Sequence, residues 1–219
     1  MPRTSRSFQP GVAYHLIARF VASEWFIRND SDRWQYLRLF GRALVRSDWR
    51  CVAFAVMSNH IHLAMVAGHQ ALASWIGAVH GPFAEWINAR QRRIGSVFVR
   101  GPNAFAVRND GIAKLVSYIH QNPVRARVVA RASDSTWTSY DAYLRPETAP
   151  PFVDVESGFR LMGTRDLAAL DRARVTRAEV EAIRLVPKKR GGRPRLVDWR
   201  LNAIDVAAPT TASAAEFHW

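Results

Sequence analysis

The sequence contains a single cysteine, few lysines and no long apolar run. Cys51 has no partner within the chain, which excludes an internal disulfide and any zinc site built from several cysteines. No apolar stretch approaches the roughly 18–20 residues that a membrane-spanning helix needs. The basic N-terminal segment is not followed by the apolar stretch of a secretory signal. We therefore expect no membrane partner and a reducing, cytoplasmic setting.

Acidic side chains are scarce in the first three-fifths of the chain. Residues 1–131 hold 18 basic and 6 acidic residues, whereas residues 132–219 hold 13 and 12, within a formal net charge of +13. A folded domain with this excess attracts polyanions, and nucleic acid is the usual partner. The alternative is a basic protein from a GC-rich genome, because 28 of the 31 basic residues are arginine. With DNA as the partner, the expected location is the bacterial cytoplasm, on the nucleoid.

Apolar side chains, by contrast, are abundant and regularly spaced. Hydrophobic residues make up 48% of the chain and aromatic residues 11%, which is enough for a core. The patterns predict strands over 12–20, 50–57 and 60–66, a strand before residue 107, and helices over 30–46, 70–93 and 110–122. Gly81-Pro82 is expected to interrupt or kink the second helix. The order β-α-β-β-α-β-α indicates an α+β domain, in which helices pack against an antiparallel sheet.

The composition changes after residue 144. We expect residues 145–163 to be a linker, residues 164–200 to be an accessory helical and basic extension, and residues 201–219 to be a disordered tail. Lys188–Arg195 (KKRGGRPR) is similar to an AT-hook, which binds the DNA minor groove, although Gly191-Gly192 adds a residue. A solvated basic linker explains this stretch equally well.

Two histidines lie on one predicted strand. In His60-Ile61-His62, strand alternation puts both imidazoles on one face and Ile61 on the other, towards the core. Two imidazoles one pleat apart can bind a single divalent metal ion. The alternatives are a pair of surface or hydrogen-bonded histidines without a metal, and a zinc hydrolase. The zinc site needs a third ligand, and no second cluster of His, Asp or Glu stands at ligand spacing.

A tyrosine and an asparagine lie one turn apart in the last predicted helix. Tyr118 and Asn122 share a helical face because they are four residues apart, and Pro123 puts Asn122 at the helix C-terminus. A tyrosine with an ordinary pKa near ~10 is a poor nucleophile unless its phenolate is stabilised or a metal polarises the electrophile. The alternative is a half-buried core tyrosine. Combined with the histidine pair and the basic charge, the pattern indicates metal-assisted phosphoryl transfer on DNA.

These segments resemble the single-tyrosine HUH transposases, in particular the REP-associated tyrosine transposases. Met57-Ser58-Asn59-His60-Ile61-His62 is similar to their M-P-N-H-hydrophobic-H strand, and SYIHQNPVRARV at 117–128 to their Y-I-H-x-N-P-V-R-A helix end. The resemblance also includes YHLIAR at 14–19, FIRND at 26–30 and WTSYDAY at 137–143. It extends over residues 8–144 and implies a ferredoxin-like or RRM-like HUH core as the catalytic domain.

The resemblance also implies a mechanism. His60 and His62 would bind Mg²⁺ or Mn²⁺, with Asn122 as the third protein ligand and Gln121 as its alternative. Tyr118 would attack the scissile phosphate in line and form a 5′-phosphotyrosine, which needs no ATP. The activity would be that of a DNA endonuclease and strand transferase acting on single-stranded DNA beside a REP-like hairpin. The protein would be a monomer or a homodimer.

Three segments depart from the family pattern. Arg19-Phe20-Val21 stands where relatives commonly carry Arg-Gly-Asn, and Ser58 replaces a proline. Residues 98–104 (FVRGPNA) stand where relatives carry a basic F-x-G-R-[FY]-K-like segment. Loss of a cation there motivates an alternative function, that of a diverged, non-catalytic protein that binds single-stranded or hairpin nucleic acid.

Arginines near the motifs are the candidates for contacts with the DNA backbone. They are Arg19, Arg92, Arg93, Arg100, Arg125 and Arg127. His15 and His120 are expected to pack or to contact phosphates rather than to bind metal. Each phosphate contact should steepen the dependence of log affinity on log salt by about one unit.

Overall fold

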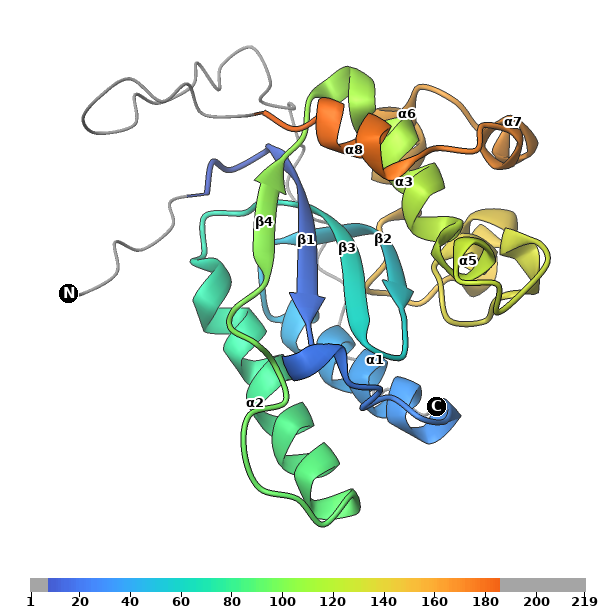
Figure 1. The fold of residues 1–219 in the computed structure, drawn as a ribbon. Helices are drawn as coiled ribbons and strands as arrows, with labels where there is room; N and C mark the ends of the chain where they lie inside the picture. Colours follow the sequence, from blue (N-terminus) through green and yellow to red (C-terminus); the bar gives the residue numbers. More distant parts are fainter. Residues whose placement is uncertain (1–7, 186–219) are drawn as a thin grey trace.

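Four antiparallel strands form a single sheet in the computed structural model, which describes residues 8–185 (Figure 1). The spatial order is β2-β3-β1-β4. The strands are β1 (Ala13–Arg19), β2 (Arg50–Val56), β3 (His60–Val66) and β4 (Asn103–Ala106). The predicted α+β class and the predicted order of the elements are confirmed.

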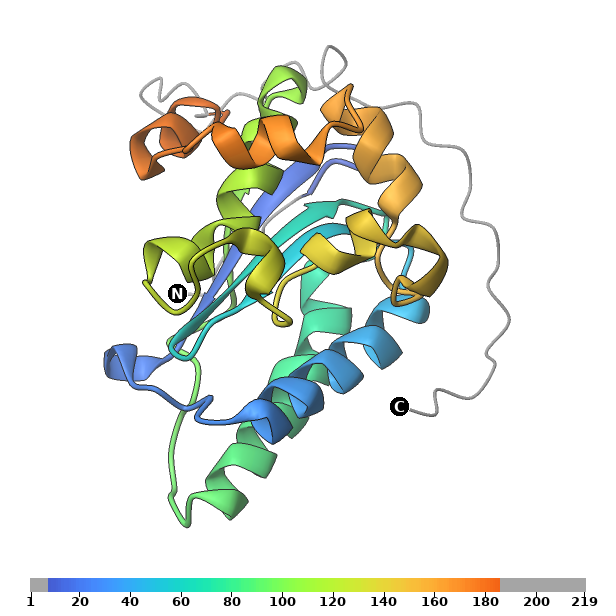
Figure 2. The same ribbon diagram turned by 90° about the vertical axis from the view of Figure 1, so that its right-hand side faces the viewer.

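Helices cover both faces of the sheet, as Figure 2 shows. One face carries α1 (Asp30–Val45) and α2 (Leu72–Arg90). The opposite face and the β2 edge carry α3 (Ile112–His120), α4 (Asn122–Arg125), α5 (Tyr140–Leu144), α6 (Val155–Met162), α7 (Leu167–Arg172) and α8 (Arg177–Ala182). Single 3-10 turns are η1 (Val21–Ser23), η2 (Asn109–Gly111), η3 (Ala132–Asp134) and η4 (Pro146–Thr148). In the part of the chain described, no helix combines the length and apolarity needed to cross a membrane.

The face towards α1 and α2 holds the large apolar core. Leu16, Ile61 and Leu63 point to this side by strand alternation and are at most 1% exposed. Phe40 of α1 and Phe83 of α2 are fully buried and pack against the same core. Burial of this apolar area is the main source of folding free energy.

The face towards α3 has smaller side chains at the strands that α3 crosses. Ala55 lies opposite His62, and Ala53 lies opposite Ala64, so these alanines share the face of the histidines. All three alanines are buried. Because methyl groups occupy little space, α3 can pack directly on β2 and β3. This close packing brings the side chains of α3 onto the histidine face.

Other segments cover the β2 edge of the sheet and the end of the β4 edge. Along β2, the backbone N–H of Val56 donates to the carbonyl of Trp137 at 2.9 Å, and the Tyr143 hydroxyl donates to the carbonyl of Val52 at 2.7 Å. Along β4, the N–H of Leu185 donates to the carbonyl of Ala106 at 2.8 Å. Covered edges of this kind prevent aggregation through strand pairing.

Two segments differ from the expectation. Helix α2 continues through Gly81-Pro82 without an interruption, and Pro82 lies exposed on its solvent side, where water can satisfy the carbonyl that lacks a partner. Residues 145–163, expected to be a linker, include η4 and α6, and the side chain of Tyr143 packs on α6 at Phe159. The basic stretch Lys188–Arg195 and the tail 201–219 lie outside the described residues.

Candidate functional site

His60 and His62 lie side by side on the α3 face of β3. Their ring centroids are 4.7 Å apart and the ring planes are perpendicular. Ile61 between them is fully buried on the opposite side, so the predicted alternation is confirmed. His62 is 4% exposed, whereas His60, at the first position of the strand, is partly exposed. A ligand can therefore reach the pair from the His60 end.

A neighbouring group orients each ring through its Nδ1 atom. The Nδ1 of His60 lies 2.6 Å from the Oδ1 of Asn59, and the Nδ1 of His62 lies 2.8 Å from the Nε2 of His15. Because an amide oxygen only accepts hydrogen bonds, His60 carries its proton on Nδ1 and keeps a lone pair on Nε2. Histidine ligands in proteins are commonly oriented through their second nitrogen in this way.

His15 of β1 contacts His62, and the sequence patterns did not predict this contact. Its ring is fully buried, stacks at 5.0 Å from that of His62, and has no hydrogen-bond partner at Nδ1. Its location inside the Tyr14–Arg19 strand, two residues from Ile17, which pairs with His62, is the signal that could have revealed the contact. His15 supports His62 from behind and is not itself a further ligand on the open side.

All three imidazoles are neutral near neutral pH. Burial lowers the pKa of His60 to about 4 and that of His15 to about 3, and it lowers the pKa of His62 well below the usual value. The charged neighbours that add to these shifts are all cations, Arg19 and Arg125 among them. Neutral imidazole is the form that coordinates metals, so near neutral pH no proton would compete with a metal ion for these rings.

Tyr118 of α3 faces the histidines. Its ring centroid lies 5.7 Å from that of His62 and 6.1 Å from that of His15, in both cases edge-on. The guanidinium of Arg125 covers the Tyr118 ring at 3.7 Å. Tyr118 is 8% exposed. The sequence placed these residues in separate motifs, and the packing of α3 on the sheet brings them together.

Asn122 and Gln121 point in different directions. The Nδ2 of Asn122 donates to the carbonyl of Tyr118 at 3.0 Å, and its Oδ1 accepts from Arg125 at 2.8 Å. Gln121 instead donates to the carbonyls of Leu170 and Asp171 in α7, at 3.2 and 2.9 Å. Asn122 therefore belongs to the Tyr118 group, whereas Gln121 attaches α7 to α3.

The helix carrying these residues ends earlier than expected. Helix α3 stops at His120, Gln121 is its C-cap, and the single turn α4 begins at Asn122 with Pro123 in its first turn. His120 is buried, lies 2.9 Å from the Ser139 hydroxyl through Nε2, and packs against Tyr140. It is thus a core residue, in agreement with the packing interpretation.

The arginines predicted to contact DNA are in different situations. Arg19 ends β1 opposite His60 and is exposed beside the site. Arg125 is engaged with Tyr118 and Asn122. Arg93 lies over the ring of Phe26 at 4.2 Å, in a structural role. The remaining three are exposed: Arg92, Arg100 and Arg127.

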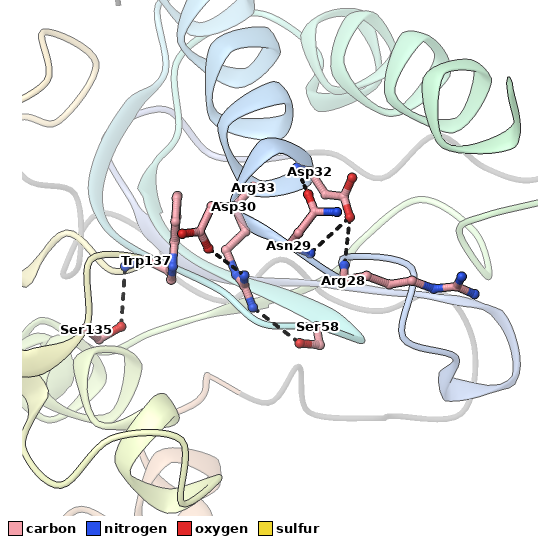
Figure 3. Close-up of polar contacts among 8 residues, drawn as sticks. All are labelled: Arg28, Asn29, Asp30, Asp32, Arg33, Ser58, Ser135 and Trp137. Atoms are coloured by element: carbon pink, nitrogen blue, oxygen red, sulfur yellow. Dashed lines mark hydrogen bonds and ion pairs between the residues drawn. The ribbon is translucent and has the colours of Figure 1, made fainter. Parts of the chain in front are cut away.

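The turn that carries His60 is held by the start of α1 (Figure 3). An NH2 group of Arg33 donates to the Ser58 hydroxyl at 3.4 Å, and the N–H of Ile27 donates to the Ser58 carbonyl at 3.2 Å. Asn29 caps α1 by accepting from the N–H of Asp32 at 3.1 Å. Ser58, which stands in place of the family's proline, thus has a hydrogen-bonding role of its own.

The donor set fits a divalent metal only if amide or phosphate oxygens complete it. Within residues 8–185, no group of three His, Cys, Asp or Glu side chains could hold a metal ion. The Nε2 atoms of His60 and His62 supply two nitrogen donors, and the amide oxygen of Asn122 retains a second lone pair. Imidazole nitrogens suit zinc and other transition metals, whereas amide, phosphate and water oxygens suit Mg²⁺ and Mn²⁺, so the oxygen ligands would decide which ion this mixed set prefers.

Comparisons with known proteins agree with this arrangement. The sequence model of the family described as "Transposase IS200 like" matches residues 9–122. A comparison with curated protein sequences gives no match. The fold is similar to that of a REP-associated tyrosine transposase bound to a REP hairpin, with a TM-score of 0.56 and 15% identity, over 71% of this chain and 93% of that chain.

Two further solved structures are more distant. A proposed transposase from Deinococcus radiodurans R1 has a TM-score of 0.38 and 14% identity over 58% of this chain and 92% of that chain. A bacterial tRNA(His) guanylyltransferase (Thg1)-like protein in complex with GTP has a TM-score of 0.40 and 9% identity, over 57% of this chain and 71% of that chain.

The family match spans more than half of the sequence and contains the histidine pair, Tyr118 and Asn122. This chain therefore belongs to the IS200-like transposase family and has the fold of a REP-associated tyrosine transposase.

Proposed function

We propose that this transposase cuts and rejoins single-stranded DNA with Tyr118 as its nucleophile. The observation that carries the proposal is the contact between the two motifs, in which the ring of Tyr118 lies 5.7 Å from that of His62, and His62 lies 4.7 Å from His60. A nucleophile next to a pair of neutral imidazoles is the constellation expected for metal-assisted phosphoryl transfer. A purely structural tyrosine does not require such neighbours.

The cutting step conserves the phosphodiester bond energy. The Tyr118 hydroxyl oxygen attacks the phosphorus, the bond from phosphorus to the 3′-oxygen breaks, and the 5′ phosphate stays on the protein. The phenolic proton passes to solvent, and the departing 3′-oxygen takes up a proton from solvent. Rejoining runs the same exchange in reverse, so no nucleoside triphosphate is consumed.

Named residues have separate tasks in this step. His60, His62 and the amide oxygen of Asn122 would hold a Mg²⁺ or Mn²⁺ ion, which would supply Lewis-acid polarisation of the scissile phosphate. Arg125, 3.7 Å above the ring of Tyr118, stabilises the phenolate that develops during attack and rejoining. Asn59 and His15 keep the two imidazoles oriented. Gln121 is left out of the ligand set because its amide points to the carbonyls of α7, away from the Tyr118 group.

We propose single-stranded DNA next to a hairpin as the substrate. The basic excess of residues 1–131 and the exposed Arg19 beside His60 support a polyanionic substrate. The structurally similar transposase was solved with a REP hairpin. Shape and stacking suffice to recognise such DNA, which needs no helix in the major groove. The chain acts on it as a monomer or a homodimer.

A covalent adduct tests the proposal. Wild-type protein and Tyr118→Phe are incubated with a 5′-labelled or 3′-labelled hairpin oligonucleotide and Mn²⁺, then separated on a denaturing gel. We expect an adduct that carries the 3′ label with wild type only, because the 5′ phosphate of the downstream fragment stays on the protein. An adduct with Tyr118→Phe means that another residue is the nucleophile.

The same experiment separates the catalytic function from simple binding. If wild type binds the hairpin but forms no adduct with Mg²⁺ or Mn²⁺, the protein is a non-catalytic binder, as the departures at residues 98–104 would allow. His69→Ala serves as a matched control, since it removes an exposed histidine after β3 that is outside the site. We expect that variant to form the adduct at the wild-type rate.

A further inference from the structure

The segment after α8 reaches the histidine face although it lies beyond the family match, which ends at residue 122. The N–H of Arg108 donates to the carbonyl of Ile183 at 3.0 Å, and the N–H of Leu185 donates to that of Ala106 at 2.8 Å. These bonds pair Arg184 with Val107 at the end of β4. The backbone of Arg184 is therefore held on both sides by the sheet edge.

A glycine allows this segment to lie so close. A Cβ atom added to Gly111 would be 2.6 Å from the Cβ of Ile183, nearer than side chains approach one another. Gly111 lies in η2, directly before α3, and Ile183 is buried. The α8 segment is thus packed onto the base of the helix that carries Tyr118, and Arg184 follows Ile183 by one residue.

The side chain of Arg184 lies on the same face as the histidines. Its guanidinium covers the ring of Phe105 at 3.7 Å. Phe105 of β4 pairs directly with His15 of β1, so their side chains share one face of the sheet. The guanidinium of Arg184 therefore lies over the strand next to β1, on the face of the sheet that carries His15 and from which Tyr118 approaches His15.

The charge of Arg184 is incompletely paired. Its side chain is only 16% exposed, and its Nε is buried without a hydrogen-bond partner. Its NH1 lies 3.9 Å from a Glu181 oxygen that already accepts from Arg177 at 2.9 Å. A partly desolvated cation whose ion pair is this long gains from an anion that binds it.

The electrostatic couplings agree with this placement. Arg184 is among the cations that lower the pKa of His15, after the larger effect of burial. Burial lowers the pKa of Arg184 itself, and Glu181 and Tyr118 oppose that shift. The charge of Arg184 therefore acts on His15, the residue that contacts His62.

We propose that Arg184 binds a backbone phosphate of the DNA strand that enters the Tyr118 site, and that the C-terminal segment is thereby part of the DNA-binding site. This inference rests on the proposed function. The guanidinium, supported on one face by Phe105, has the planar fork that matches two phosphate oxygens. The segment predicted to be an accessory extension thus supplies a substrate contact outside the motifs of the family.

Binding, measured without cleavage, tests the role of Arg184. All variants carry Tyr118→Phe, and a fluorescein-labelled hairpin with a single-stranded arm is titrated by anisotropy at several salt concentrations. We expect Arg184→Gln to weaken binding about tenfold and to reduce the salt slope by about 0.7–0.9, because one phosphate contact is lost. The control is Arg165→Gln, which removes another arginine of the extension that lies over a ring, Phe159, and pairs with a glutamate, Glu156.

The outcomes are separable. Arg165→Gln should stay within about twofold of the parent, with an unchanged salt slope. Equal effects of the two substitutions overturn the inference, as does a parent protein that binds no DNA. If Arg184→Gln melts at a lower temperature than the parent, Arg184→Lys is decisive, since it keeps the charge. We expect that variant to bind about two- to fivefold more weakly with the parent salt slope, and full parent affinity overturns the bidentate contact.

The proposed function can fail independently. The adduct experiment uses Tyr118 intact, whereas these titrations use Tyr118→Phe throughout. Loss of binding in Arg184→Gln without any wild-type adduct supports the Arg184 contact and contradicts cleavage. If wild type forms the adduct but Arg184→Gln and Arg165→Gln bind DNA equally well, cleavage is supported and the Arg184 contact is contradicted.

Discussion

The two faces of the sheet differ in the size and polarity of their side chains. The face towards α1 and α2 presents Leu16, Ile61 and Leu63, which are almost completely buried among aromatic rings. The face towards α3 presents His15 and His62 with alanines beside them. Alternation along the same strands thus places the apolar residues that stabilise the fold on one face and the candidate catalytic histidines on the other. On β3, a substitution on the α3 face should therefore reduce DNA cutting with little effect on folding, and a substitution on the opposite face should reduce stability with little effect on DNA cutting.

The largest expected effect is on catalysis. We expect His60→Ala to reduce the rate of adduct formation by about 1,000-fold or more, because it removes a metal ligand. Its free energy of unfolding should change by less than about 1 kcal/mol, since His60 is partly exposed at the start of β3. Single-turnover kinetics and urea unfolding measure the two quantities. More than a tenth of the wild-type rate would mean that His60 is not required.

On the other face, the effect should be on stability. Leu63 is 1% exposed, so Leu63→Ala should lower the free energy of unfolding by about 2–5 kcal/mol through lost burial and a cavity. Adduct formation per folded molecule should be unchanged at a temperature well below the transition. A rate that falls in proportion to the His60→Ala rate would show that the two faces are not independent.

Acid should lower the free energy of unfolding, because protons bind more readily to the imidazoles of the unfolded chain than to those buried near α3. Burial lowers the pKa of His120 from 6.5 to about 3. The unfolded chain then binds more protons below pH 6.5, so the stability due to neutral His120 is complete above that pH and is lost as the pH falls towards 3. Between about pH 7 and pH 4.5 the loss amounts to at most about 2.5 kcal/mol.

His120→Gln isolates that contribution. The glutamine amide can still hydrogen-bond the Ser139 hydroxyl but does not titrate. We expect the fall in unfolding free energy between the two pH values to be smaller in the variant than in wild type, measured by urea unfolding at each pH. Identical falls would show that His120 is already protonated in the folded protein near pH 4.5.

The smallest effect concerns the turn after β1. Ala22 has φ 51° and Ser23 has φ 56°, a left-handed conformation that costs a residue with a Cβ roughly 1 kcal/mol. Ala22→Gly should therefore stabilise the protein by about 0.5–1 kcal/mol. Ala78→Gly, at an exposed position inside α2, should destabilise it by about 1 kcal/mol. Thermal unfolding of both variants checks the two signs.

Elements with a strong local pattern could be predicted within a residue or two. Strand β3 begins and ends at the predicted residues, 60 and 66, and α1 begins at the predicted residue, Asp30. The prediction for the end of α3 was less accurate, because the sequence indicated that the helix stops at Asn122-Pro123 and did not indicate the separate turn α4. A proline in the first turn is compatible with starting a new helix as well as with ending one.

The candidate site was predictable as two motifs but not as an arrangement. His60 and His62 on one face follow from the period of a strand, and Tyr118 with Asn122 follows from the period of a helix. The contact of Arg125 with the Tyr118 ring and the opposite orientation of Gln121 do not follow from spacing, since both depend on what packs around α3.

Short-range periodicity and side-chain chemistry thus decide which residues of this protein form strands, helices and the two halves of the site. They act over a few residues, and the sequence displays them directly. The partnership of His15 with His62, the approach of Tyr118 to both, and the position of Arg184 over Phe105 join segments far apart in the chain. Only the packing of α3 and α8 on small residues such as Ala55 and Gly111 decides them, because a close approach depends on the shapes of both surfaces.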